Sequence, residues 1–236
     1  MSIWARFAEL LSSTASNAFS SVVEAVRTAF EGDPATRRRV AFSIAMIALS
    51  AKMAKADGVV TQPEVAAFYQ IFEVPENDRA NVARLYTLAQ QDVAGYQAYA
   101  AQMAKLRGGS TQDCPVLEDI LDGLFYIATS DGLVHQNELG FLEDVSSIFG
   151  ISDSHFDAIL ARHVETGKRD PYAVLGIDRT LAFAEARKAW LKLVRENHPD
   201  LMVARGLPQE FIAIANARLA AINAAYEQIE REKKAA

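Results

Sequence analysis

Three consecutive residues, His198, Pro199 and Asp200, combine an imidazole and a carboxylate around a proline. Pro199 fixes its own backbone and biases His198 away from helical geometry, so a helix that reaches this point should end there. His198 and Asp200 would then lie on a loop, where both side chains can make directional contacts with a partner. The tripeptide therefore indicates a binding site.

Two acidic pairs form a second candidate site. The segment 54–64 recurs 74 residues later as 128–138, and each copy has Asp-Gly followed by a glutamate seven positions after the aspartate. In one interpretation the four carboxylates converge on a divalent metal, because hard cations prefer clustered carboxylate oxygens. The residues concerned are Asp57, Glu64, Asp131 and Glu138. Neither copy matches the ligand pattern of an EF-hand loop.

The same repeat has a purely structural interpretation, which we favour. Gly58 and Gly132 can take the left-handed conformation that ends a helix. Thr61 and Glu64 have the spacing of a capping box, and Pro63 between them is tolerated in a first helical turn. Each copy would then end one helix and begin the next, and no metal would be needed.

Helical spacing of apolar residues runs through nearly the whole chain, and no convincing strand alternation is present. The predicted fold class is therefore all-α. Glycine and proline breaks at Gly32-Asp33-Pro34 and at Gly167-Lys168-Arg169 suggest three parts. These are an amphipathic segment at 1–32, a helical bundle at 33–167 and a smaller helical unit at 168–236.

The smaller unit is expected to contain a short helix at Pro171, a helix over about 181–197 and a long helix over about 208–233. The middle helix has an apolar face that includes Phe183, Ala186, Trp190, Leu193 and Val194, and a basic side with Arg187, Lys188, Lys192 and Arg195. The long helix should pack against it as an antiparallel pair. Its contact face would hold Phe211, Ala215, Ile222, Ala225, Tyr226 and Ile229.

The motifs DPYAVLGI at 170–177, ENHPD at 196–200 and INAAYEQI at 222–229 together resemble a J-domain. This co-chaperone module docks on DnaK-type chaperones and stimulates their ATPase. The resemblance implies a docking surface formed by Arg187, Lys188, Lys192, Arg195, His198, Pro199 and Asp200. Leu201 and Leu191 stand where the family often has lysine and arginine, so the surface carries less positive charge than usual.

The repeat at 54–64 and 128–138 resembles the all-helical TerB-like family. A TerB-like domain followed by a carboxy-terminal J-domain is the order of DjlA-type J-proteins, which the run at 198–211 also resembles. Those proteins usually carry an amino-terminal membrane span. The most apolar run here, 40–51, has 12 residues, whereas a membrane helix needs roughly 20.

Composition narrows the function classes. The formal charge is −6, and residues 170–236 carry ten Lys/Arg against nine Asp/Glu, so the acidic excess lies in the front part. An acidic front part argues against nucleic acid as the main partner. The single cysteine excludes an internal disulfide framework and fits a reducing compartment, so we expect a cytoplasmic protein.

The leading hypothesis is a co-chaperone without enzymatic activity of its own. Its J-domain would engage a DnaK-type chaperone, and the helical bundle would choose the site of action by binding a client. No phosphate loop or nucleophile elbow is present, so no cofactor is expected apart from a divalent metal at the acidic pairs. The alternatives are a metal- or stress-responsive TerB-like binding protein and a peripheral membrane adaptor anchored by residues 1–30.

Overall fold

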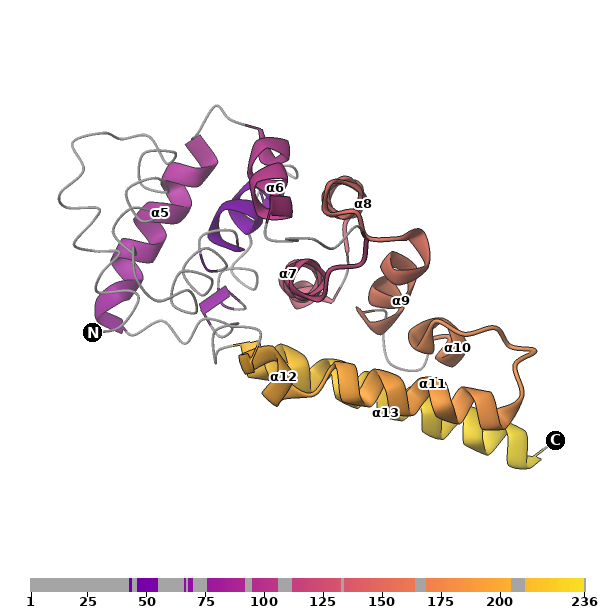
Figure 1. Cartoon of the computed structure of the whole chain (residues 1–236). Helices are drawn as coiled ribbons and strands as arrows, with labels where there is room; N and C mark the ends of the chain where they lie inside the picture. Colours follow the sequence, from indigo (N-terminus) through magenta and orange to yellow (C-terminus); the bar gives the residue numbers. More distant parts are fainter. Residues whose placement is uncertain are drawn as a thin grey trace.

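The computed structural model describes residues 43, 46–54, 66, 68–69, 76–91, 95–105, 112–132, 134–163, 169–204 and 211–235. Within these ranges every regular element is helical and none is a strand, which confirms the all-α prediction (Figure 1). The amphipathic segment expected at 1–32 lies outside the described residues. No helix among the described residues is long and apolar enough to cross a bilayer.

The described elements follow one another along the chain as helices. They are η1 (Glu76–Asp78), α5 (Arg79–Gln91), α6 (Tyr96–Ala104), α7 (Pro115–Ala128), η3 (Thr129–Asp131), α8 (Gln136–Phe149), α9 (Asp153–His163), α10 (Pro171–Leu175), α11 (Phe183–Glu196), α12 (Pro199–Ala204) and α13 (Ile212–Ala235). Residues 46–54 are also helical.

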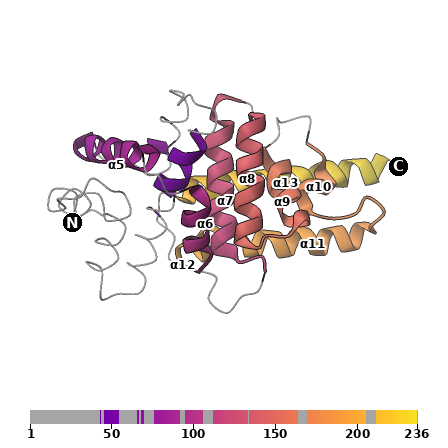
Figure 2. The same ribbon diagram turned by 90° about the horizontal axis from the view of Figure 1, so that it is seen from above.

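Helix α7 is the central element of the larger bundle. It begins at Pro115, which needs no amide partner in a first turn. Leu121, Leu124 and Phe125 are buried, and α8 packs alongside α7 (Figure 2). The core around them includes Met46, Ile47, Leu49, Met53, Leu117, Ile120, Phe141, Leu142, Val145 and Phe149.

The second copy of the sequence repeat is the turn between α7 and α8. Gly132 has φ = 98°, in the left-handed region, and follows the single turn of η3. At the start of α8 the carboxylate of Glu138 accepts a hydrogen bond from the backbone N–H of His135 at 2.9 Å. The prediction that this copy ends one helix and begins another is therefore confirmed.

The smaller unit contains the antiparallel pair formed by α11 and α13, with α10 packed against α13. Trp190 stacks on Tyr226 with ring centroids 4.3 Å apart, and its indole N–H donates to Asn223 Oδ1 at 2.9 Å. Phe183 stacks on the same tyrosine at 6.0 Å. The predicted contact of this pair is confirmed for Ile222, Ala225, Tyr226 and Ile229, which share a buried cluster with α10.

The predicted contact face is wrong for Phe211 and Ala215, which are buried in the larger core instead. An added Cβ at Gly123 of α7 would lie 3.0 Å from the Phe211 ring and 3.0 Å from Met46 Cε, so the ring packs directly on the helix backbone. The beginning of α13 passes below α7 (Figures 1 and 2). One long helix thus contributes to both cores.

Candidate partner-docking surface

The His198-Pro199-Asp200 turn connects α11 to α12. Helix α11 ends at Glu196, one residue before its predicted end. The loop expected after His198 is partly wrong, because Pro199 begins the short helix α12. The reason is local: proline suits a first turn, and the His198 carbonyl accepts from the N–H of Leu201 at 2.9 Å.

Both polar side chains of this turn are accessible. The side chain of His198 is 53% exposed and that of Asp200 is 91% exposed. His198 Nδ1 lies 3.2 Å from the backbone nitrogen of Asp200, from which it accepts a hydrogen bond, and 3.6 Å from Asp200 Oδ2. The two groups are therefore held together and face solvent, as a contact surface requires.

The basic side of α11 is exposed along its length, as the sequence predicts. The side chains of Arg187, Lys188, Lys192 and Arg195 are all exposed. Lys188 pairs with Glu185 at 2.8 Å and Lys192 with Glu196 at 3.8 Å, both within the helix. Such exposed pairs contribute roughly 0–1 kcal/mol, so they hold the two lysine side chains only weakly.

An apolar edge adjoins the tripeptide on α12. Leu201 is 42% exposed and Val203 is 43% exposed, and they are the exposed large hydrophobic residues of the described chain. Leu201 is the residue that replaces the usual lysine of the resembled family. The surface next to Asp200 therefore offers apolar contact where the resembled family often has a positive charge.

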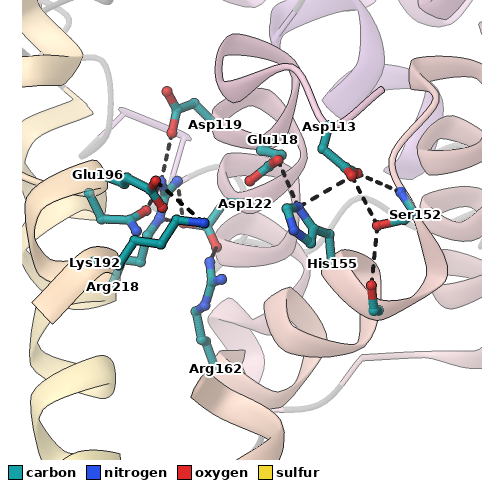
Figure 3. A network of polar contacts seen from close by, with 12 residues as sticks. Asp113, Glu118, Asp119, Asp122, Ser152, His155, Arg162, Lys192, Glu196 and Arg218 are labelled. Atoms are coloured by element: carbon teal, nitrogen blue, oxygen red, sulfur yellow. Dashed lines mark hydrogen bonds and ion pairs between the residues drawn. The ribbon is translucent and has the colours of Figure 1, made fainter. Parts of the chain in front are cut away.

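A buried ion-pair network lies behind the docking surface and was not anticipated from the sequence (Figure 3). The Arg218 guanidinium of α13 donates to Asp119 at 2.7 Å and to Asp122 at 2.9 Å, and both carboxylates belong to α7. The same guanidinium donates to Asn197 Oδ1 at 2.9 Å. The sequence did contain one sign of this network, because Asp119 and Asp122 lie three positions apart in a largely apolar helix.

The electrostatics of Asp122 follow from its neighbours. Burial raises its pKa, but Arg218, a hydrogen bond from His163 at 3.0 Å and Arg162 outweigh burial, and the net pKa is well below the ordinary value. Burial alone would lower the pKa of Arg218. The attraction of Asp122 and Asp119 outweighs burial, so the net pKa of Arg218 lies above its ordinary value. Both groups are therefore charged at neutral pH.

A separate polar cluster joins Asp113, Glu118 and His155 (Figure 3). One ligand atom from each lies within 4.8 Å of the others, which is close enough for a metal ion. His155 Nδ1 lies 2.9 Å from Glu118, and Asp113 accepts from the backbone N–H of Ser152 at 2.7 Å. Burial raises the pKa of Glu118, against the effect of the His155 hydrogen bond.

Of the four acidic residues predicted as metal ligands, Glu138 is the one whose side chain the structure describes. Glu138 is 1% exposed and its carboxylate caps the start of α8. Asp131 is the last residue of η3, and Asp57 and Glu64 lie outside the described residues. At Glu138 the structural interpretation accounts for the carboxylate, and the convergence of the four side chains stays a prediction.

Comparison with known proteins decides the family. The model of the family described as tellurite resistance protein TerB matches residues 43–161, which is half of the chain. The chain belongs to the TerB family. The matched region includes α7 and α8, so the TerB domain contains the repeat turn and both carboxylates that bind Arg218.

Relatives extend the likeness beyond the TerB domain. The co-chaperone protein DjlA of Photobacterium profundum is 27% identical over 222 residues, covering 83% of this chain and 79% of its own. DjlA of Photorhabdus laumondii is 25% identical over 231 residues, covering 83% and 81%. DjlA of Shewanella oneidensis is 33% identical over 118 residues, covering 45% of each chain. The chain is a DjlA-type protein with a TerB domain.

No solved structure matches the chain significantly.

Proposed function

We propose that this protein is a co-chaperone that docks on a DnaK-type chaperone and stimulates its ATP hydrolysis. One observation carries the proposal: His198 and Asp200 are exposed at the end of a helix whose basic side is also exposed. The co-chaperone names of the relatives support the same class of function. The protein acts as a regulator, and the ATP hydrolysis is performed by its partner.

The docking contact has two parts with different chemistry. The basic side of α11 supplies long-range attraction to an acidic surface, which raises the association rate more than the affinity. His198 and Asp200 supply short directional hydrogen bonds at the end of that helix. Leu201 and Val203 add apolar contact area beside them. This division fits a transient complex that forms quickly and is specific.

The TerB domain would direct the co-chaperone to its site of action. We assign it to binding a client or an anchoring partner, because the acidic excess of the chain lies outside residues 170–236. The docking surface on the smaller unit stays free for the chaperone in this arrangement. We place the protein in the cytoplasm, on the support of a single cysteine, Cys114, that is buried and unpaired.

Single-turnover ATP hydrolysis by the DnaK-type chaperone of the same source tests the proposal. The wild-type chain should accelerate hydrolysis, and His198→Gln should lose that effect while its thermal unfolding is unchanged, because His198 is exposed. His155→Gln is the matched control, since His155 is a partly exposed histidine on α9 outside the docking surface. Equal stimulation by His198→Gln and the wild type would contradict the docking assignment.

A further inference from the structure

The residue next to the docking tripeptide is linked to the TerB domain indirectly, through a partly buried hydrogen bond to Arg218 of α13. Asn197 follows the last helical residue of α11 and directly precedes His198. Its side-chain oxygen accepts from Arg218 at 2.9 Å, and its side-chain nitrogen donates to the carbonyl of Leu193 at 2.8 Å. The Asn197 amide thus has a partner on each side, which fixes the direction in which the chain leaves the helix.

Arg218 is itself held rigidly, because its side chain is only 3% exposed and is bound to α7. Its Nε donates to Asp122 at 2.9 Å and one terminal nitrogen donates to Asp119 at 2.7 Å. A planar guanidinium with several directed donors holds one orientation far better than a lysine ammonium would. The terminal nitrogen that reaches Asp119 also reaches Asn197.

The packing of α13 supports a rigid connection. The larger core buries Phe211, which directly precedes this helix, and Ile214 and Ala215, which lie in its first turn. Ile222 and Tyr226, further along, are buried in the smaller core. Arg218 lies between these two groups, at the point where α13 passes from one core to the other. The position of Arg218 relative to α7 is therefore set by buried side chains on both sides.

We propose that Arg218 is a positioning residue through which the TerB domain sets the orientation of the docking turn. Asp119 and Asp122 orient Arg218, Arg218 orients Asn197, and Asn197 orients His198 and the start of α12. This inference rests on the proposed function for its biological meaning. The geometric part, a turn held from α7, can be tested without any chaperone.

Variants at Asn197 separate the Arg218 contact from the helix end. Asn197→Ala removes both hydrogen bonds of the side chain, whereas Asn197→Asp keeps an acceptor for Arg218 and loses the donor to Leu193. In the full chain we expect Asn197→Ala to weaken chaperone stimulation by about tenfold, in the range of measured coupling effects. Asn197→Asp should stay within about twofold of the wild type.

The matched control is Asn223→Ala, which removes a side-chain amide bonded to Trp190 in the same unit without touching the turn. It should stimulate like the wild type. Wild-type stimulation by Asn197→Ala would overturn the inference. Equal impairment of Asn197→Ala and Asn197→Asp would also overturn it, because the helix end and not Arg218 would then be responsible.

A spectroscopic experiment keeps the two proposals distinguishable. In amide NMR spectra of the full chain, Asp119→Asn on α7 should shift the resonances of His198, Asp200 and Leu201. Asp144→Asn, which changes an exposed carboxylate on α8 bonded to Tyr96, should leave those resonances in place. Shifts confined to α7 and its direct neighbours would overturn the positioning role. If the wild type fails to stimulate the chaperone but these shifts occur, only the proposed function fails.

Discussion

At the scale of single residues, Asp122 is a buried carboxylate surrounded by basic side chains. Its carboxylate lies near Arg218, Arg162 and His163, and it is 2% exposed. A buried pair of this kind adds little when compared with an apolar replacement, but removing one partner leaves the other charge without compensation. The contact between α7 and α13 is therefore stable only while the buried carboxylates and the Arg218 guanidinium remain paired.

The substitution Asp122→Asn should lower the free energy of unfolding by about 3–5 kcal/mol at neutral pH, because Arg218 would lose one of its two carboxylates. Urea unfolding followed by circular dichroism measures this change. The exposed Asp144→Asn serves as its control and should change the value by less than about 1 kcal/mol. A similar small effect for both variants would show that Arg218 is satisfied without Asp122.

The depressed pKa of Asp122 predicts a pH dependence with a definite sign. The group stabilises the fold above its unfolded pKa, about 3.9, and this contribution is lost as pH falls toward the folded pKa. Below about pH 3.9 the wild type should lose roughly 1.4 kcal/mol per pH unit from this group. Unfolding curves measured between pH 2 and 6 should show that slope, and Asp122→Asn should lack it. Parallel slopes for both proteins would contradict the assignment.

At the scale of elements, the turn between α7 and α8 shows how one residue ends a helix. Gly132 has φ = 98°, and a side chain there would be strained although nothing lies within 4 Å of an added Cβ. Gly140, inside α8, also has open space but no positive φ. The two glycines therefore separate the effect of backbone conformation from the effect of packing.

Gly132→Ala should destabilise the protein by about 1–2 kcal/mol, because a Cβ is unfavourable in the left-handed region. Gly140→Ala should instead stabilise it by up to about 1 kcal/mol, since alanine is the better helix former. Thermal unfolding of the two variants beside the wild type measures the direction of both stability changes. Destabilisation by both would mean that Gly140 makes a contact that the structure does not contain.

At the scale of the whole molecule, α13 connects the two buried cores. Its residues Ile214 and Ala215, with Phe211 directly before the helix, are buried in the larger core, and Tyr226 is buried in the smaller core. Helix α9 of the larger bundle also packs against α10 of the smaller unit. Removing a buried side chain from one end of α13 should therefore affect both cores.

Phe211→Ala should lower the free energy of unfolding by about 3–5 kcal/mol, because it removes a fully buried ring. Trp190 fluorescence, measured with Trp4 replaced by phenylalanine, follows the smaller unit, and far-ultraviolet circular dichroism follows all helices. Both transitions should move together by the same amount, as expected for two-state unfolding. A shift seen by circular dichroism alone would indicate two independent units.

The amino-acid sequence by itself determined the helical class, the basic side of α11, the end of that helix before Pro199 and the turn at Gly132. These features depend on periodicity, proline and glycine geometry and capping, all of which act over a few neighbouring residues. The same local rules could have indicated the start of α12, because Pro199 suits a first helical turn as well as a loop.

Tertiary structure alone decided where Phe211 packs and which groups bind Arg218. An apolar period shows which face of a helix is buried, but not which of two cores will bury each end of it. Arg218 meets Asp122 and Asp119 across 96 and 99 positions of the chain, and no local pattern links residues that far apart. The connection between the TerB domain and the docking turn arises only when both cores form around one helix.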